Sequence, residues 1–244
     1  MSALALLLGS IALLASPWLL RPKAGNRDEI CGILRPLWWI NQLYVGVMHH
    51  LTIENEAQLP RDGPAILIAN HTCGIDHLIL QAGTRRLLGF MVAQEFYDHR
   101  LYHPFCKMIG CIPVKRDGRD QSAIRAALRI LKKGRVLPIF PEGKINASSG
   151  REFHEAKSGA AYIALRAKVT VIPAYIRGTP HTNQIGESLS TPSHAILRFG
   201  PPVDLSDLMD GGRDRENLEE VTARLMNAIK AIRDQVMNET PTHA

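Results

Sequence analysis

Six short apolar runs alternate with helical patterns along the middle of the chain, and this alternation is the strongest constraint on its fold. Each run has the length and apolar character of a buried strand; the runs are residues 64–69, 89–93, 111–115, 136–140, 169–176 and 195–199. Helices between strands supply the crossovers that parallel strands need. The sequence therefore predicts an α/β fold with a largely parallel, covered sheet and flanking helices.

Two helical patterns are clear outside the apolar runs. In residues 119–133 the apolar side chains share one face, and Gly134 follows as a stop signal. Residues 218–236 repeat apolar side chains at helical spacing, which predicts a long amphipathic helix. Because 244 residues with 45% hydrophobic composition suit one core, we expect a single α/β domain over residues 51–244.

The first 20 residues have a different character. Residues 3–20 are almost wholly apolar, and as a helix they would measure about 27 Å, enough to cross a bilayer. Arg21, Lys23 and Arg27 follow this stretch instead of preceding it, which argues against a secretory signal and favours a cytoplasmic location for the remainder. A cleaved signal and a monotopic, half-inserted helix are the alternatives.

A second apolar segment, residues 33–48, carries the aromatic side chains Trp38, Trp39 and Tyr44. Indole and phenol rings prefer the headgroup zone of a bilayer. The segment therefore predicts a helix on the membrane surface, although a helix packed on the domain's own core has the same pattern. We expect residues 1–50 to form membrane-anchoring or interfacial helices.

A histidine and an aspartate stand where the first apolar run gives way to a helix. If the chain from His71 to Asp76 were all helical, the two side chains would lie about 140° apart. They can meet only across a bend, which Gly74 favours, and Asn70 or Thr72 can cap the helix. A carboxylate that accepts one ring proton leaves the other nitrogen free to act as a base. The pattern thus favours a His–Asp pair at a strand-to-helix corner.

The sequence lacks the Gly-x-Ser-x-Gly elbow that would supply a protein nucleophile, so the reacting hydroxyl can belong to a substrate. One alternative is that His71 caps the helix and Asp76 lies in its solvated first turn. Another is a metal site formed by His71, Cys73, Asp76 and His77. The four cysteines show no paired spacing, which indicates free thiols in a reducing compartment.

Positive charge is concentrated in one part of the chain. The formal net charge is +6, and residues 100–135 contain ten Lys and Arg against only Asp117 and Asp120. This surface suits an anionic partner such as phospholipid headgroups, coenzyme A, an acidic carrier protein or nucleic acid. Aromatic residues are sparse and do not alternate with the basic ones, so we expect no nucleic-acid partner.

Three further stretches belong to predicted strands or to their ends: Phe140-Pro141-Glu142-Gly143-Lys144, the run from Gly110 to Arg116, and Val171-Ile172-Pro173. The first is a rigid turn that fixes Glu142 and nearby amides. Ligands of parallel sheets bind at the carboxyl ends of strands. We therefore expect His71, Arg116 and Glu142 to line one crevice.

Together these stretches resemble the glycerolipid acyltransferase superfamily, whose best-known members are the lysophosphatidic acid acyltransferases. The matched motifs are Asn-His-x-x-x-x-Asp at Asn70, His71 and Asp76, a Gly-led strand ending in arginine at Gly110 and Arg116, Phe-Pro-Glu-Gly at Phe140 to Gly143, and an apolar strand with proline at Val171 to Pro173. Lys157-Ser158-Gly159-Ala160 is similar to the family's Lys-x-Gly-Ala segment. The resemblance covers residues 59–202.

The resemblance implies a membrane-associated O-acyltransferase of phospholipid biosynthesis. Such an enzyme moves an acyl chain from acyl-coenzyme A or acyl carrier protein to a lysophospholipid hydroxyl, with lysophosphatidate the leading acceptor, and needs neither metal nor resident cofactor. His71 would be the general base and Asp76 its orienting partner. The implied substrate-binding residues are Asn70, Arg116 for the phosphate, Phe140, Pro141, Glu142 and Gly143 for the glycerol-like part, Lys144 and Pro173.

One departure from the family pattern bears on the acceptor. After Phe-Pro-Glu-Gly the family commonly continues Thr-Arg-Ser, whereas this chain has Lys144-Ile145-Asn146. A lysine at 144 lacks the guanidinium fork. Another lyso-lipid, such as a lyso-ornithine lipid, is therefore an alternative acceptor. A noncatalytic module that binds anionic lipid and a serine or metal hydrolase are the rival functions.

Overall fold

The computed structural model describes residues 30, 32–100, 102–115, 121–146, 148–209, 211–212 and 214–239. The predicted helix over residues 3–20 and the predicted phosphate ligand Arg116 lie outside these residues. The strands are β1 (Thr52–Glu54), β2 (Ala65–Ala69), β3 (Met91–Ala93), β4 (Ile112–Val114), β5 (Val136–Ile139), β6 (Thr170–Arg177) and β7 (Ile196–Phe199). The helices are α2 (Leu34–Met48), α3 (Asp76–Ala82), α4 (Gln94–Tyr97), α5 (His103–Ile109), α6 (Gln121–Lys132), α7 (Gly159–Ala167), α8 (Ile185–Ser190) and α9 (Arg215–Glu239).

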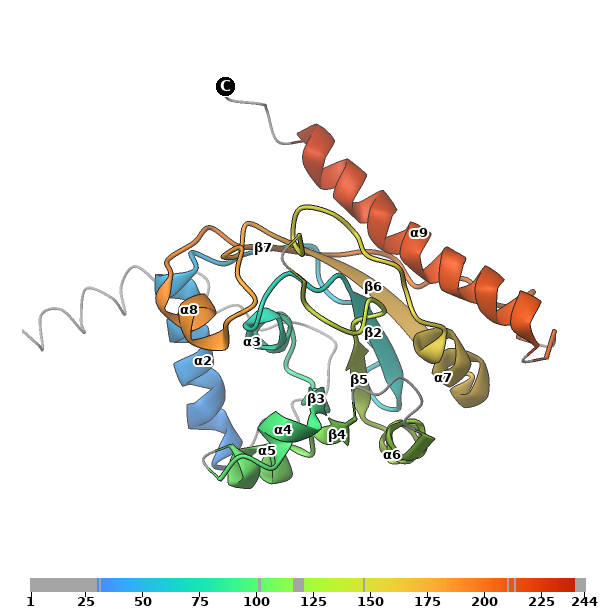
Figure 1. Ribbon diagram of the computed structural model, residues 1–244, viewed down its shortest axis with the longest axis horizontal. Helices are drawn as coiled ribbons and strands as arrows, with labels where there is room; N and C mark the ends of the chain where they lie inside the picture. Colours follow the sequence, from blue (N-terminus) through green and yellow to red (C-terminus); the bar gives the residue numbers. More distant parts are fainter. Residues whose placement is uncertain are drawn as a thin grey trace, which may run out of the picture.

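The main sheet has five strands in the order β1-β7-β6-β2-β5 (Figure 1). β2 lies between β5 and β6 and pairs with both in parallel, and β1 pairs in parallel with β7. Only the β6–β7 pair is antiparallel in this sheet. The prediction of a largely parallel sheet is confirmed, with one antiparallel join near its edge.

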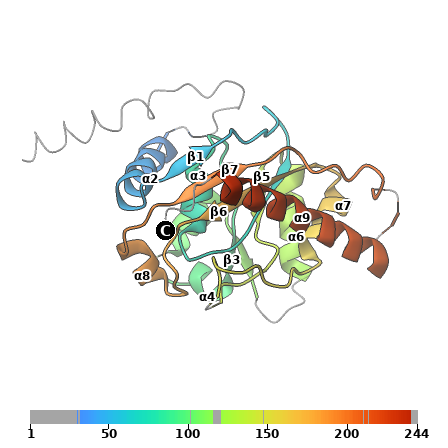
Figure 2. The same ribbon diagram turned by 90° about the horizontal axis from the view of Figure 1, so that it is seen from above.

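Alternate residues of β2 face two different cores, because successive side chains of a strand point to opposite faces. Ile66 and Ile68 pack with α6, α7 and α9, whereas Ala65, Leu67 and Ala69 pack with α2 and α3. Figures 1 and 2 show these two groups of helices on opposite sides of the sheet. All five β2 residues are buried, which is why this strand reads as a continuous apolar run.

The small sheet of β3 and β4 corrects one expectation. These strands pair with each other and not with the five-stranded sheet, and a single bridge from Leu88 to Val136 joins their neighbourhood to β5. The run that leads toward Arg116 therefore belongs to a different sheet from the strands before His71 and Glu142. The expectation that all three follow strands of one sheet is wrong, because strand pairing is not encoded in an apolar run.

The segment predicted as an interfacial helix is α2, and one of its faces packs on the domain. Trp38, Asn41 and Gln42 donate to main-chain carbonyls in or just after α3 at 2.9–3.4 Å, and Val45 is fully buried. The opposite face is 44–62% exposed at Ile40, Leu43 and Val47, and Ile33, the residue just before α2, is 66% exposed. Among the described residues, no helix is both long and apolar enough to cross a membrane.

Candidate active site

His71 and Asp76 form the predicted pair at the carboxyl end of β2. The ring Nδ1 of His71 lies 2.7 Å from Oδ2 of Asp76, and Asp76 is the first residue of α3. The Asp76 side chain is fully buried, whereas that of His71 is 17% exposed. With Nδ1 engaged by the carboxylate, Nε2 is the ring nitrogen left for a substrate proton.

The buried carboxylate of Asp76 is held by several donors from the loop before α3. The main-chain amides of Thr72 and Cys73 donate to Oδ2 at 2.5 and 3.0 Å, and the Thr72 hydroxyl donates to Oδ1. The hydroxyl of Thr179, which follows β6, donates in turn to that of Thr72 at 2.7 Å. Buried charge is tolerated only when it is hydrogen-bonded in this way. Thr179 lies 107 residues from Thr72 in sequence, and no local pattern marked it.

Asn70 joins two strands instead of capping a helix. Its side-chain amide donates to the carbonyl of Ile176 and its side-chain oxygen accepts from the Ile176 amide, both at 2.8 Å. The side chain thereby continues the β2–β6 pairing beyond Ala69. The expectation that Asn70 or Thr72 caps the helix is wrong. The N-cap residue of α3 makes no side-chain capping bond, and the main-chain amides of the loop donate to the Asp76 carboxylate.

Gly74 is needed for a close approach and not for a left-handed bend. Gly74 is not one of the described glycines that have a positive φ. A Cβ at this position would lie 2.9 Å from Cγ1 of Ile185 in α8, and the Gly74 amide donates to Ser188 Oγ at 3.3 Å. The glycine therefore lets α8 pack on the loop that carries the pair.

The turn from Phe140 to Gly143 fixes both the backbone and the ring of His71. Glu142 is buried, and its Oε1 accepts from the His71 amide at 2.9 Å while its Oε2 accepts from the His154 amide at 2.8 Å. The Phe140 ring stacks on the imidazole with centroids 4.1 Å apart and planes 10° apart. Gly143 has a φ of 72°, and its amide donates to the Phe140 carbonyl at 3.0 Å.

The other sequence-predicted residues lie in different places. Pro141 is buried in the turn, and Lys144 is exposed immediately after it. Pro173 is buried within β6 opposite Ile68, and its carbonyl accepts from Gly200 at 2.9 Å. The structure thus brings His71, Asp76, Phe140, Glu142 and Gly143 together directly. His154 joins them through its main-chain amide, a contact that no residue-type pattern reveals.

Two further titratable groups lie close to the pair. Burial lowers the pKa of His77 to about 4, and burial together with the Asp76 charge raises the pKa of the Cys73 thiol to about 11. Both groups are therefore neutral near pH 7. Cys73, Cys106 and Cys111 are free thiols. The described part of the chain contains no cluster of three or more His, Cys, Asp or Glu side chains that could hold a metal ion.

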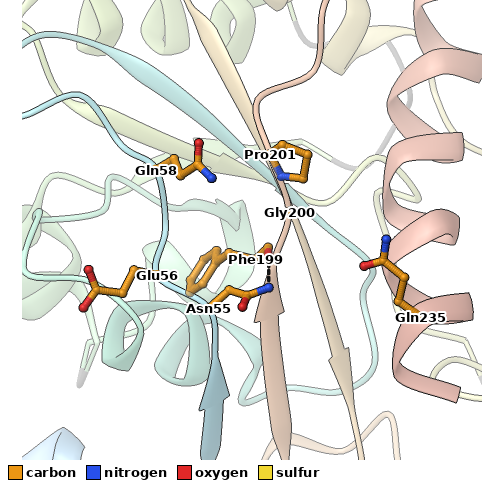
Figure 3. Close-up of a pocket in the computed structure, with 7 residues that line it drawn as sticks. All are labelled: Asn55, Glu56, Gln58, Phe199, Gly200, Pro201 and Gln235. Atoms are coloured by element: carbon orange, nitrogen blue, oxygen red, sulfur yellow. Dashed lines mark hydrogen bonds between the residues drawn. The ribbon is translucent and has the colours of Figure 1, made fainter. Parts of the chain in front are cut away.

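A pocket of about 430 Å³ lies near the edge of the main sheet that β1 forms, beside the end of β7 (Figure 3). Its lining residues follow β1, lie at or just after the end of β7, or belong to α9: Asn55, Glu56, Gln58, Phe199, Gly200, Pro201 and Gln235. Asn55 donates to the Phe199 carbonyl at 3.3 Å across it. Since β7 runs antiparallel to β6, and β6 parallel to β2, the carboxyl end of β7 is opposite the end that carries His71. This pocket is therefore separate from the His–Asp pair.

Comparison with known proteins gives consistent results. The Acyltransferase family model matches residues 50–177. A 1-acyl-sn-glycerol-3-phosphate acyltransferase of Streptococcus pneumoniae is 29% identical over 82% of this chain and 69% of its own, and that of Bacillus subtilis is 25% identical over 75% and 88%. The crystal structure of the 1-acyl-sn-glycerophosphate acyltransferase of Thermotoga maritima matches with a TM-score of 0.63 and 20% identity over 94% of this chain and 88% of that one. At this identity the structural match shows a shared fold.

Proposed function

The chain belongs to the Acyltransferase family, and from that premise we propose that it acylates the hydroxyl of a lysophospholipid, with lysophosphatidate as the acceptor. The acyl donor is the thioester of coenzyme A or of acyl carrier protein. One observation carries the proposal: the 2.7 Å contact that fixes Nδ1 of His71 on the buried Asp76 carboxylate. The names of the Streptococcus and Bacillus relatives support the choice of acceptor.

In the proposed reaction, Nε2 of His71 removes the proton from the acceptor hydroxyl as its oxygen attacks the thioester carbonyl carbon. A C–O bond forms, the C–S bond breaks, and the departing thiolate takes the proton back from the imidazolium. The negative charge of Asp76 stabilises the imidazolium and keeps Nε2 directed toward the acceptor. The step needs no acyl-enzyme and no resident cofactor.

The acceptor and donor are placed around this pair by residues that the family resemblance suggests. Glu142 accepts the His71 main-chain amide, and with Gly143, the next residue of the same turn, it is proposed for the glycerol-like part of the acceptor. Arg116 is proposed as a phosphate ligand, since a guanidinium binds phosphate through paired hydrogen bonds. The basic residues between 100 and 135 would receive the donor's phosphates or the acidic surface of a carrier protein.

Membrane attachment is the remaining part of the proposal. The exposed apolar face of α2, at Ile33, Ile40, Leu43 and Val47, fits the headgroup boundary of a bilayer. The apolar residues 3–20 would hold the enzyme at the cytoplasmic side of the inner membrane. In that position the site can take lyso-lipid directly from the leaflet.

A panel assay tests the function. The purified full-length chain is given acyl-coenzyme A or acyl carrier protein with lysophosphatidate, lyso-ornithine lipid or other lyso-lipids, and both thiol release and lipid mass are measured. Lysophosphatidate should be converted to phosphatidate, and His71→Ala should lower the rate by about 10² to 10⁴. Wild-type rates in the mutant would refute the mechanism. Salt-sensitive vesicle binding without turnover would instead identify a noncatalytic lipid-binding module.

A further inference from the structure

The chain after the Phe140–Gly143 turn returns to lie along it. The amide of His154 donates to the Glu142 carboxylate at 2.8 Å, and the amide of Lys157 donates to the Pro141 carbonyl at 2.9 Å. These two bonds fix residues 154–157 beside the turn whose Glu142 also holds the His71 amide. The main chain of Lys157 is therefore held by the same turn that holds the main chain of His71.

The Lys157 side chain crosses the open side of Gly143. A Cβ at Gly143 would lie 3.1 Å from Cδ, 3.2 Å from Cε and 3.3 Å from Nζ of Lys157. Gly143 also has a left-handed φ of 72°, which disfavours any other residue. The glycine leaves room for the lysine stem, and the stem in turn keeps the ammonium next to the turn.

The ammonium of Lys157 is available for an anion. The residue is exposed, and within the described part of the chain it has no acidic partner. α7 begins two residues later, and its N-cap Ser158 makes no side-chain cap bond, so the start of this helix adds partial positive charge close to Lys157 in the chain. By contrast, no contact among the described residues fixes the exposed side chain of Lys144.

We propose that Lys157 binds the anionic phosphate of the acceptor headgroup, in place of the arginine that the family commonly has where this chain has Ile145. This inference rests on the proposed function. A lysine is a point charge on a flexible stem, and the packing of the stem on Gly143 supplies the fixed position that it otherwise lacks. Lys157 is thus a specificity-determining residue that favours phosphate-bearing acceptors over neutral ones.

The test compares charge removal with charge retention in the full-length chain. Lys157→Met keeps the stem over Gly143 and removes the ammonium, Lys157→Arg keeps the charge, and Lys230→Met removes an exposed lysine from another element, α9. Lys157→Met should raise KM for lysophosphatidate about tenfold or more, since hydrogen bonds to charged groups have this strength. KM for the thioester donor and the rate with monoacylglycerol should stay near wild type. Lys157→Arg should recover most of the loss, and Lys230→Met should match wild type.

Binding without turnover separates this inference from the proposed function. Glycerol 3-phosphate is titrated against each variant and followed by ³¹P NMR, with no acyl donor present. Weaker binding in Lys157→Met than in wild type supports Lys157 as a phosphate ligand. If no lyso-lipid is turned over but this difference in binding is found, only the proposed function fails. Equal binding in both, or no binding to wild type, overturns the inference. A larger effect from Lys144→Met than from Lys157→Met overturns it as well.

Discussion

The main-chain amide of His71 donates to the buried carboxylate of Glu142 at 2.9 Å. This contact joins the loop after β2 to the turn after β5, two segments that are 71 residues apart in sequence. The adjacent Phe140 ring stacks on the imidazole. The Phe-Pro-Glu-Gly turn therefore positions His71, the proposed general base.

Glu142→Gln should impair catalysis even though the substitution is nearly isosteric. Both Glu142 oxygens accept main-chain amides, and a glutamine presents an NH₂ group to one of them. The resulting loss of a charge-assisted bond corresponds to about 1.5–3 kcal/mol, so kcat should fall roughly 10- to 100-fold. Steady-state kinetics measure this, with the exposed Glu152→Gln as the control. Wild-type kcat in Glu142→Gln would show that the turn does not position His71.

Cys73 should be dispensable for the chemistry despite its place beside Asp76. Its pKa is raised to about 11, so the thiol is protonated at neutral pH and is a poor nucleophile. Cys73→Ala should keep kcat within about threefold of wild type, although loss of the buried sulfur costs about 1 kcal/mol of stability. Activity and thermal unfolding are measured on the same sample. Complete loss of activity in a folded variant would favour a thiol mechanism.

The elements that could be predicted from the sequence are those whose own residues show an apolar run, a helical pattern or a stop signal. β2 is buried at every position and reads as a continuous apolar run, and α6 ends before Gly134, whose φ is 77°. β1 was missed because its three residues are exposed or partly buried and form no apolar run. The separation of β3 and β4 from the main sheet was missed because the pairing partner of a strand depends on tertiary packing.

At the candidate site too, contacts between nearby residues could be predicted and contacts between distant segments could not. His71 and Asp76 were found together because they stand five residues apart and meet across one local bend. Thr179, His154 and Lys157 were not assigned a position there, since Thr179 reaches Thr72 from the distant end of β6. The other two make their contacts through main-chain amides, which every residue type except proline possesses.

Acid should destabilise the protein through His77. Its pKa is lowered from 6.5 to about 4, chiefly by burial, so between these values the unfolded chain binds the proton and the folded chain does not. This contribution to the unfolding free energy is therefore complete above pH 6.5 and is lost as the pH falls toward 4, by about 3 kcal/mol. Denaturant titrations at several pH values measure the slope of the unfolding free energy against pH. The slope should decrease in His77→Gln, and an unchanged slope would assign the acid sensitivity to other groups.

Thr72→Val should reduce kcat by removing one donor to Asp76 without changing the shape of the side chain. The Thr72 hydroxyl donates to Asp76 and accepts from Thr179, so its loss leaves a buried carboxylate oxygen short of a partner and the Thr179 hydroxyl without its acceptor. We expect a fall in kcat of about tenfold with little change in KM. Thr72→Ser keeps the hydroxyl and should restore most of the rate, whereas Thr179→Val, one bond further from the carboxylate, should have a smaller effect. A wild-type rate in Thr72→Val together with a loss in Thr72→Ser would mean that packing of the methyl group, and not the hydrogen bond, maintains the pair.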